Sequence, residues 1–264
     1  MNKTLKIILS IVFAILVLFV LISSRKHQAD MQMASPEIHL EVIDGMTLIT
    51  KSEIEDLLMQ AGLFNSGIKR SDFDIKSIES ILAQTNEIES VEVFTKLDGE
   101  WHIKARLKRP IVRVIDPNNT DFYLDSKGSL MGISPYYRPK VLAVTGMNTL
   151  WGNDFEYQEV INNDSLITKY KLRDLYLISS YVCNDAFYDA LIVQIEYTKG
   201  LGFILVPRLG NQRIVLGDGF SEEEINRKFL KLTTFYEEVI PYEGWDAYKT
   251  VDLRFENQIV AKKN

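Results

Sequence analysis

The chain has 264 residues, of which 36 are acidic and 30 are basic, and its formal net charge is −6. Residues 1–30 hold four basic side chains and one acidic one, so the remainder carries a net charge of −9. This acidic excess argues against nucleic acid or an anionic lipid surface as a partner. The single cysteine, Cys183, excludes an intramolecular disulfide.

An apolar stretch at 7–22 dominates the start of the chain. Fourteen of its sixteen residues are Leu, Ile, Val or Phe. Residues 5–24 would form about 30 Å of helix, which is enough to cross a bilayer. We therefore expect a cytoplasmic stub at 1–4 and a transmembrane helix at 5–24. A cleaved signal peptide is the alternative, but its apolar run is usually about 7 to 15 residues long.

The orientation of this helix is not fixed by charge, because basic residues flank both of its ends. An anchor at the start of a chain, followed by a long polar remainder, is typical of a single-pass protein whose body is exported. We expect the body to lie outside the cytoplasm, after a polar linker at 25–36.

Residues 37–108 predict a compact α/β domain. Apolar and polar residues alternate along its first strand, and capping residues begin each of two helices. The turn at Asp98-Gly99 joins two further strands, because both residues tolerate positive φ. The order strand, helix, helix, hairpin predicts a three-stranded sheet with both helices on one face. The marker residues are Ile38, Leu40 and Val42 for the first strand, Thr50, Glu53 and Gly62 for the first helix, Ser71 and Asp74 for the second, and Val91, Val93 and 101–107 for the hairpin.

Residues 109–264 predict a mostly β domain with packed helices. One helix follows Asp164-Ser165, and another begins at the capping box Ser221-Glu-Glu-Glu224; both repeat apolar residues at helical spacing. Turns rich in Pro, Gly and Asn separate the strands. The predicted strands are 111–115, 122–124, 141–144, 192–197, 203–206, 213–216, 250–255 and 258–261. The whole chain is thus expected to have an α+β fold.

The sequence predicts no catalytic, cofactor or metal site. His27, His39 and His102 lack a ligand-spaced partner such as H-E-x-x-H. Cys183 lies near a helix end, where a cysteine is more often a small core residue than a nucleophile. The acidic run 222–224 lies in the first turn of a helix, where negative charge complements the helix dipole. We therefore expect neither enzymatic activity nor a small-molecule substrate.

Several segments resemble the FtsQ/DivIB family of bacterial cell-division membrane proteins. The segment 123–128 (YLDSKG) is similar to the family's aromatic-x-Asp-x-x-Gly turn, and 248–255 (YKTVDLRF) is similar to its closing strand. The order within 37–108 resembles that of POTRA domains, small modules that lie just outside a membrane. The short end after Phe255 looks like the form found in Bacteroidota. Other matching segments are Arg109-Pro110 with Arg113-Val114, 141–146 (VLAVTG), and Ile214–Gly217 before the helix that contains 228–235.

The resemblance implies a non-enzymatic divisome scaffold in the inner membrane, with its C-terminal domain in the periplasm at the division septum. Its implied partners are the coiled-coil division proteins FtsB and FtsL, bound by β-augmentation at the C-terminal strand. The predicted partner-binding residues are Phe255, Asn257, Gln258 and Val260; the alternative for Phe255 is that it fills the core. The alternative functions are a POTRA-bearing envelope transport or outer-membrane assembly component and, more distantly, an anchored envelope hydrolase.

Overall fold

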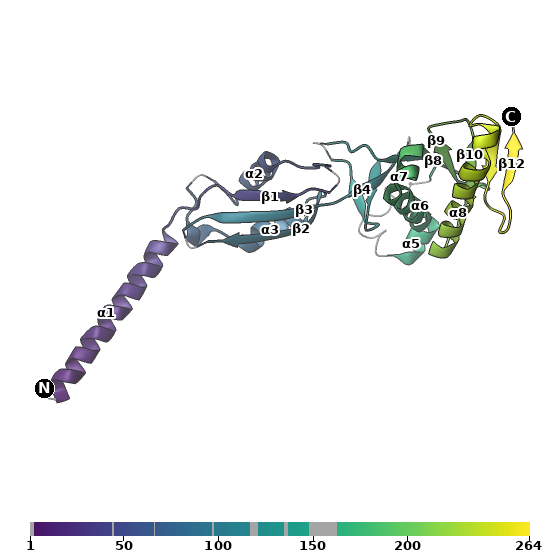
Figure 1. The fold of residues 1–264 in the computed structure, drawn as a ribbon. Helices are drawn as coiled ribbons and strands as arrows, with labels where there is room; N and C mark the ends of the chain where they lie inside the picture. Colours follow the sequence, from purple (N-terminus) through teal and green to yellow (C-terminus); the bar gives the residue numbers. More distant parts are fainter. Residues whose placement is uncertain are drawn as a thin grey trace. The chain divides into compact units, whose positions relative to one another are not determined.

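The computed structural model describes residues 3–43, 45–65, 67–96, 98–116, 121–134, 137–147 and 163–264. The chain divides into two compact units, Met1–Leu107 and Lys108–Asn264. The predicted α+β fold is confirmed: an apolar helix, a small mixed sheet and a larger mixed sheet with packed helices follow one another along the chain (Figure 1).

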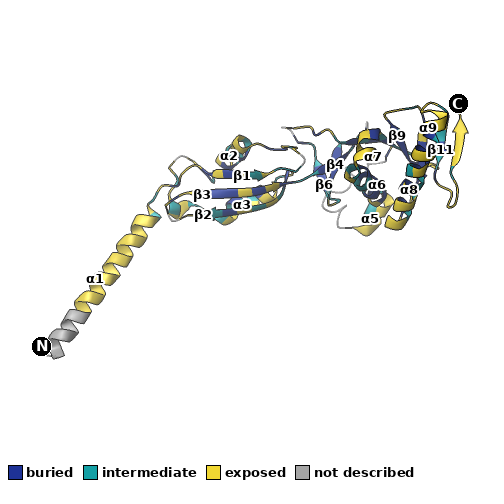
Figure 2. Ribbon diagram, viewed as in Figure 1, coloured by how far each residue is buried: buried dark blue, intermediate teal, exposed yellow. Residues whose placement is uncertain are grey.

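The first helix, α1 (Lys3–Ala29), begins the first unit. Its stretch Ile11–Ala29 is long and apolar enough to cross a membrane, and it is the one such helix in the described part of the chain. Figure 2 shows this stretch as exposed almost throughout. The helix continues past the predicted end at residue 24 and takes in Arg25 and Lys26.

The residues after α1 pack against the small domain. Lys69 Nζ lies 2.9 Å from the Asp30 carboxylate, and the Met33 amide donates to the Ile68 carbonyl at 2.9 Å. The Trp101 indole N–H donates to the Ala34 carbonyl at 2.7 Å. The segment 25–36, which was predicted as a linker, is therefore helical in its first part. Its last part packs against the small domain.

The small sheet has the strand order β1-β3-β2. Strand β1 (Glu37–Glu41) runs parallel to β3 (Trp101–Leu107), and β2 (Ile88–Thr95) runs antiparallel to it. Helix α2 (Lys51–Gln60), the 3₁₀ helix η1 (Arg70–Asp72) and helix α3 (Ile75–Ala83) lie between β1 and β2 in the chain. The predicted βααββ order is thus confirmed.

Helix α2 begins at the predicted capping box, whereas the predicted cap Ser71 lies within η1 and α3 begins only after Asp74. The Thr50 hydroxyl accepts from the Glu53 amide at 3.3 Å, and the Glu53 carboxylate accepts from the Thr50 amide at 2.6 Å. The Asp74 carboxylate caps α3. Gly62 ends the first helix region with φ +70°, a conformation that a residue without Cβ adopts freely.

Both helices cover one face of the small sheet. The alternate β3 residues Trp101, Ile103, Ala105 and Leu107 are buried. The rings of Phe64 and Phe73 lie 5.4 and 4.6 Å from that of Trp101. The intervening residues of β3 from Lys104 onward are exposed, so the opposite face is open.

The second unit contains a nine-stranded sheet in the order β12-β11-β10-β9-β8-β7-β4-β5-β6. Strand pairs β4–β7, β7–β8 and β10–β11 are parallel, and the others are antiparallel. The short strand β6 was not predicted. The strands are β4 (Pro110–Val114), β5 (Phe122–Asp125), β6 (Leu130–Gly132), β7 (Leu142–Thr145), β8 (Ile192–Thr198), β9 (Gly202–Pro207), β10 (Arg213–Gly217), β11 (Tyr248–Asp252) and β12 (Val260–Lys263).

The helices of the second unit are α5 (Asp164–Lys169), α6 (Leu172–Asn184), α7 (Ala186–Leu191), α8 (Glu222–Glu238) and α9 (Ile240–Glu243). The single helix predicted after residue 164 is interrupted, because Lys171 adopts a left-handed conformation with φ 58°. Helices α6 and α8 bury their apolar faces in the same core as the sheet. Tyr188 joins this core, and burial raises its pKa above the ordinary value.

Candidate functional site

The sheet of the second unit ends in an open edge at β12. This strand pairs antiparallel with β11 and has no described strand on its other side. All four of its residues are exposed (Figure 2). Its unpaired amide and carbonyl groups form the kind of template that a strand from another chain can extend.

Strand β11 is fixed in the sheet by its buried side chains. Val251 and the following Leu253 are fully buried in the core of the second unit. The Leu253 amide donates to the Val215 carbonyl of β10 at 2.9 Å. The edge strand therefore rests on a well-packed neighbour, which holds its position.

Lysines from α8 hold the loop between β11 and β12. Lys228 Nζ donates to the Leu253 carbonyl at 2.9 Å, and Lys231 Nζ donates to the Phe255 carbonyl at 2.7 Å. Burial lowers the pKa of both ammonium groups, and neighbouring positive charges add to the effect. These bonds satisfy carbonyl groups that no strand pairs, and they fix the path of the loop.

A second anchor of the loop is the fork between Arg254 and Asp252. The guanidinium contacts the carboxylate at 3.0 Å from Nε and 2.7 Å from Nη2, and Nη1 donates to the Gly200 carbonyl at 3.4 Å. Burial by itself raises the pKa of Asp252, but the hydrogen bonds from Arg254 outweigh it and hold that pKa below its ordinary value. The fork lies at the end of β11, where the bend that leads to β12 begins.

The end of β12 is fastened to α9. Lys263 Nζ lies 2.7 Å from the Glu243 carboxylate, and this hydrogen bond raises the pKa of the lysine. The Asn264 amide donates to the Ala247 carbonyl at 3.1 Å. Both ends of the strand are thus tied down, which lowers the entropy that a partner strand would need to remove on binding.

The predicted partner-binding residues lie in this hairpin, but not on one continuous strand. Phe255 and Asn257 lie in the bend after β11, because the Arg254 fork and the α8 lysines redirect the chain; the prediction of a strand through residue 255 is wrong. Gln258 is exposed just before β12, and Val260 begins that strand. Phe255 is 44% exposed and does not fill the core. Partner binding by these four residues stays a prediction.

Residues 109–262 match the family model described as FtsQ/DivIB, C-terminal related. The chain belongs to this family. No curated protein matches the chain. Membership suggests a role related to the bacterial divisome, in a family that is generally non-enzymatic. The matched segment takes in almost the whole second unit, including β11 and most of β12.

The FtsQ-type turn at 123–128 has the geometry that its residues predict. The Asp125 carboxylate accepts from the Lys127 amide at 2.9 Å and from the Ser129 amide at 2.8 Å. Gly128 has φ +79°, and a Cβ at this position would lie 3.4 Å from the Tyr176 ring. The aspartate and the glycine therefore shape the loop between β5 and β6.

Two of the residues considered for catalysis, Cys183 and Glu224, make structural contacts in this FtsQ-related chain. Cys183 is half-buried against the core, and its Sγ lies 3.3 Å from the Ile111 carbonyl. Glu224 completes the capping box of α8, where hydrogen bonds from Ser221 lower its pKa. Both interactions match the structural interpretations made from the sequence.

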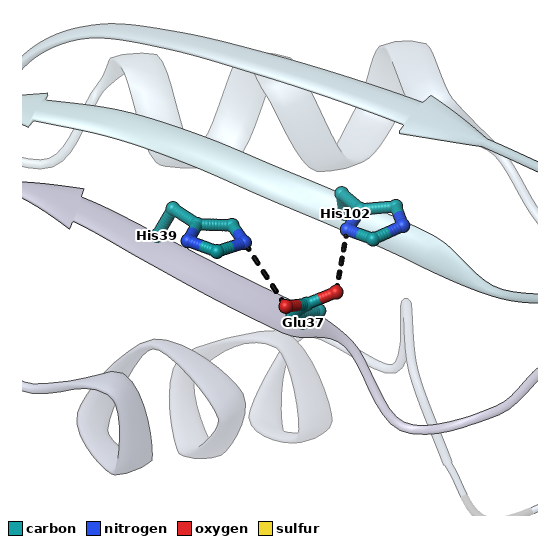
Figure 3. Close-up of side chains that lie close together, drawn as sticks. All are labelled: Glu37, His39 and His102. Carbon is teal, nitrogen blue, oxygen red and sulfur yellow. Dashed lines mark ion pairs between the residues drawn. The ribbon is translucent and has the colours of Figure 1, made fainter.

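One cluster that the sequence analysis missed lies on the open face of the small sheet, outside the family match. Figure 3 shows His39 and His102 on either side of the Glu37 carboxylate. These are the three described residues whose side chains gather as possible metal ligands. The Glu-x-His alternation on β1 was visible in the sequence, but the approach of His102 depends on the pairing of β1 with β3.

Proposed function

We propose that this chain is a membrane-anchored, non-enzymatic scaffold of the divisome. Family membership supports the division role, and α1 is long and apolar enough to be the anchor in the inner membrane. The body then lies in the periplasm, at the division septum, and the first unit serves there as a POTRA-type module. The scaffold supports septum formation by holding other division proteins in place.

The main observation in support of this proposal is the open edge at β12. A partner segment that adds a strand there pairs with backbone groups that the sheet leaves free, and its side chains meet Val260 and the preceding bend. The proposed partners are coiled-coil division proteins of the FtsB and FtsL type. Phe255 and Val260, which are 44% and 43% exposed, supply apolar contact area beside the strand.

The match to an FtsQ-related domain favours this scaffold over the envelope-transport alternative. Depletion of the protein distinguishes the two in cells. A scaffold that acts in division leaves long filaments with segregated chromosomes and no septa. Cells of normal length with reduced outer-membrane protein levels would support the transport alternative.

Binding is tested with the full chain in detergent and an immobilised FtsB-like protein. Phe255→Glu and Val260→Glu place charge beside the edge, and loss of an aromatic anchor at an interface centre often costs about 2 kcal/mol or more, roughly thirtyfold in affinity. Phe187→Glu is a matched control, because Phe187 on α7 is 46% exposed. The proposal predicts lost binding for the first two variants and retained binding for the control.

A thermal melt of each variant separates binding from folding. Weak binding together with an unchanged melt supports the edge as the site. Retained binding by both variants would move the partner elsewhere on the chain. A collapsed melt for Phe255→Glu would contradict the exposed position of this ring.

A further inference from the structure

The open face of the small sheet brings together two imidazoles and one carboxylate. Strands β1 and β3 pair in parallel with Glu37 opposite His102, and His39 lies two residues further along on the same face of β1. His102 Nδ1 lies 3.0 Å from Glu37 Oε2, and His39 Nε2 lies 3.2 Å from Glu37 Oε1 (Figure 3). Three ligand atoms of the three side chains lie within 4.8 Å of one another.

The two nitrogen–oxygen separations are close to those of a tetrahedral metal site. Nitrogen and oxygen ligands lie about 2.0–2.2 Å from zinc, so two ligands of a tetrahedral ion are about 3.3 Å apart. Two imidazole nitrogens and one carboxylate oxygen are also the ligand types of zinc sites with three protein ligands.

The three ligands differ in solvent exposure in a way that suits metal capture. The His102 side chain is 7% exposed, and its ring stacks on Phe94 at a centroid distance of 5.0 Å with the planes 13° apart. Its Nε2 is buried, so Nδ1 is the nitrogen directed at the cluster. Glu37 and His39 are 60% and 56% exposed, and they can adjust around an ion that enters from solvent.

The neighbouring cation does not occupy the cluster. Lys104 lies opposite His39 in the strand register, but its ammonium is directed over the Phe94 ring, 5.0 Å from the centroid. Further along the face, Arg106 contacts the Glu41 carboxylate at 2.9 Å. Glu37 therefore supplies the negative charge that a dication requires.

We propose that Glu37, His39 and His102 bind one divalent transition-metal ion of the zinc class, with water in the remaining position. The ion would link β1, an edge strand of the small sheet, to the central strand β3. Because a metal that binds only the folded state stabilises it, occupancy would raise the stability of the first unit. The site is structural in this proposal, and it lies in a different unit from β12.

The test uses the full chain, purified in detergent without a polyhistidine tag and stripped with a chelator. Zinc is titrated in competition with a chromophoric chelator. We expect one equivalent per chain in the micromolar range. His39→Ala and Glu37→Gln should weaken zinc binding by about 100-fold or more, because even outer-shell partners of metal ligands cost about 10- to 100-fold.

Two variants serve as matched controls. Glu41→Gln removes a carboxylate from the same strand and face, and His27→Ala removes an imidazole from α1; both should bind zinc as the wild type does. Zinc should also raise the melting temperature of the wild type but not that of His39→Ala, whose exposed position leaves folding unaffected. Binding that saturates only at millimolar zinc, or that is equal in the wild type and His39→Ala, would overturn the proposal.

Discussion

The two sheets of this protein leave different parts of themselves open. In the small sheet it is a face, where Glu37, His39 and His102 bring side-chain atoms together. In the large sheet it is the edge at β12, where backbone groups pair with no further strand among the described residues. An open face recognises through particular side chains, so a single substitution removes its chemistry. An open edge recognises largely through the backbone, so it responds most to changes that occupy or distort the strand.

The largest expected effect is a loss of stability in the first unit alone. Trp101→Ala removes a fully buried ring that contacts Phe64 and Phe73, and truncation of such a ring costs about 3–5 kcal/mol. Hydrogen exchange of the full chain should show loss of protection in the first unit, while partner binding at β12 persists. Trp245→Ala, at a side chain that is 37% exposed, is the control and should cost much less. Equal loss of protection in both units would contradict their independence.

The next largest effect on stability is expected from the loop between β11 and β12. Lys228→Met removes the hydrogen bond to the Leu253 carbonyl, and a bond from a charged donor contributes about 1.5–3 kcal/mol. Denaturant unfolding should show a loss in this range, since a buried carbonyl is left unpaired. Lys231→Met, whose carbonyl acceptors lie in the exposed bend, should cost less stability. The reverse ranking would show that the bend, rather than Leu253, fixes the loop.

The contrast between backbone and side-chain recognition can be tested by filling the open edge at β12 with a strand of the same chain. A strand appended to Asn264 through an Asn-Gly turn should fold back on β12 and fill the edge. Partner affinity should then fall by about tenfold or more, which corresponds to about 1.4 kcal/mol. A Gly/Ser tail of equal length is the control and should leave binding unchanged. Full binding with the appended strand would exclude β-augmentation at β12.

A smaller effect depends on pH. Asp252→Asn weakens the fork with Arg254 and should cost about 1 kcal/mol at neutral pH. The pKa of Asp252 is lowered from 3.8, so its stabilising contribution is present in full above that value and is lost as pH falls through the lowered pKa. Urea titrations should therefore show a difference between wild type and variant at neutral pH that shrinks below pH 3.8. A constant difference across this range would rule out the carboxylate as its source.

The smallest effect is expected on the open face away from the histidines. Glu41→Gln removes an exposed ion pair with Arg106, and such pairs contribute little because water already solvates both charges. The melting temperature of the variant should equal that of the wild type, both without zinc and with it. A smaller zinc-induced rise in the variant than in the wild type would show that the metal site extends beyond the three ligands.

Local sequence patterns predicted the parts of the fold that depend on neighbouring residues. The capping boxes at Thr50 and Ser221 and the Asp125 turn occur as predicted, because each is completed within a few residues. The break at Lys171 was missed, since no glycine or proline marks that left-handed residue. The bend at Phe255 was missed because lysines on another element impose it.

The cluster of possible metal ligands could not be predicted from the periodicity of the sequence. Alternation on β1 places Glu37 and His39 on one face, but only the parallel register with β3 sets His102 beside them. Strand order and register depend on contacts between distant segments, and one sequence does not specify them through local spacing.

The strand order of the large sheet has a consequence for how the chain is made. From β7 to β12, each strand lies beside the one that precedes it in the chain, so every new strand is added at the same side. A strand that emerges during synthesis therefore finds its template already complete, which favours folding in the order of translation. Among the described strands, the last one added in this series is β12, at the open edge of the sheet. A partner strand at β12 would continue, in trans, the same series of additions that built the domain.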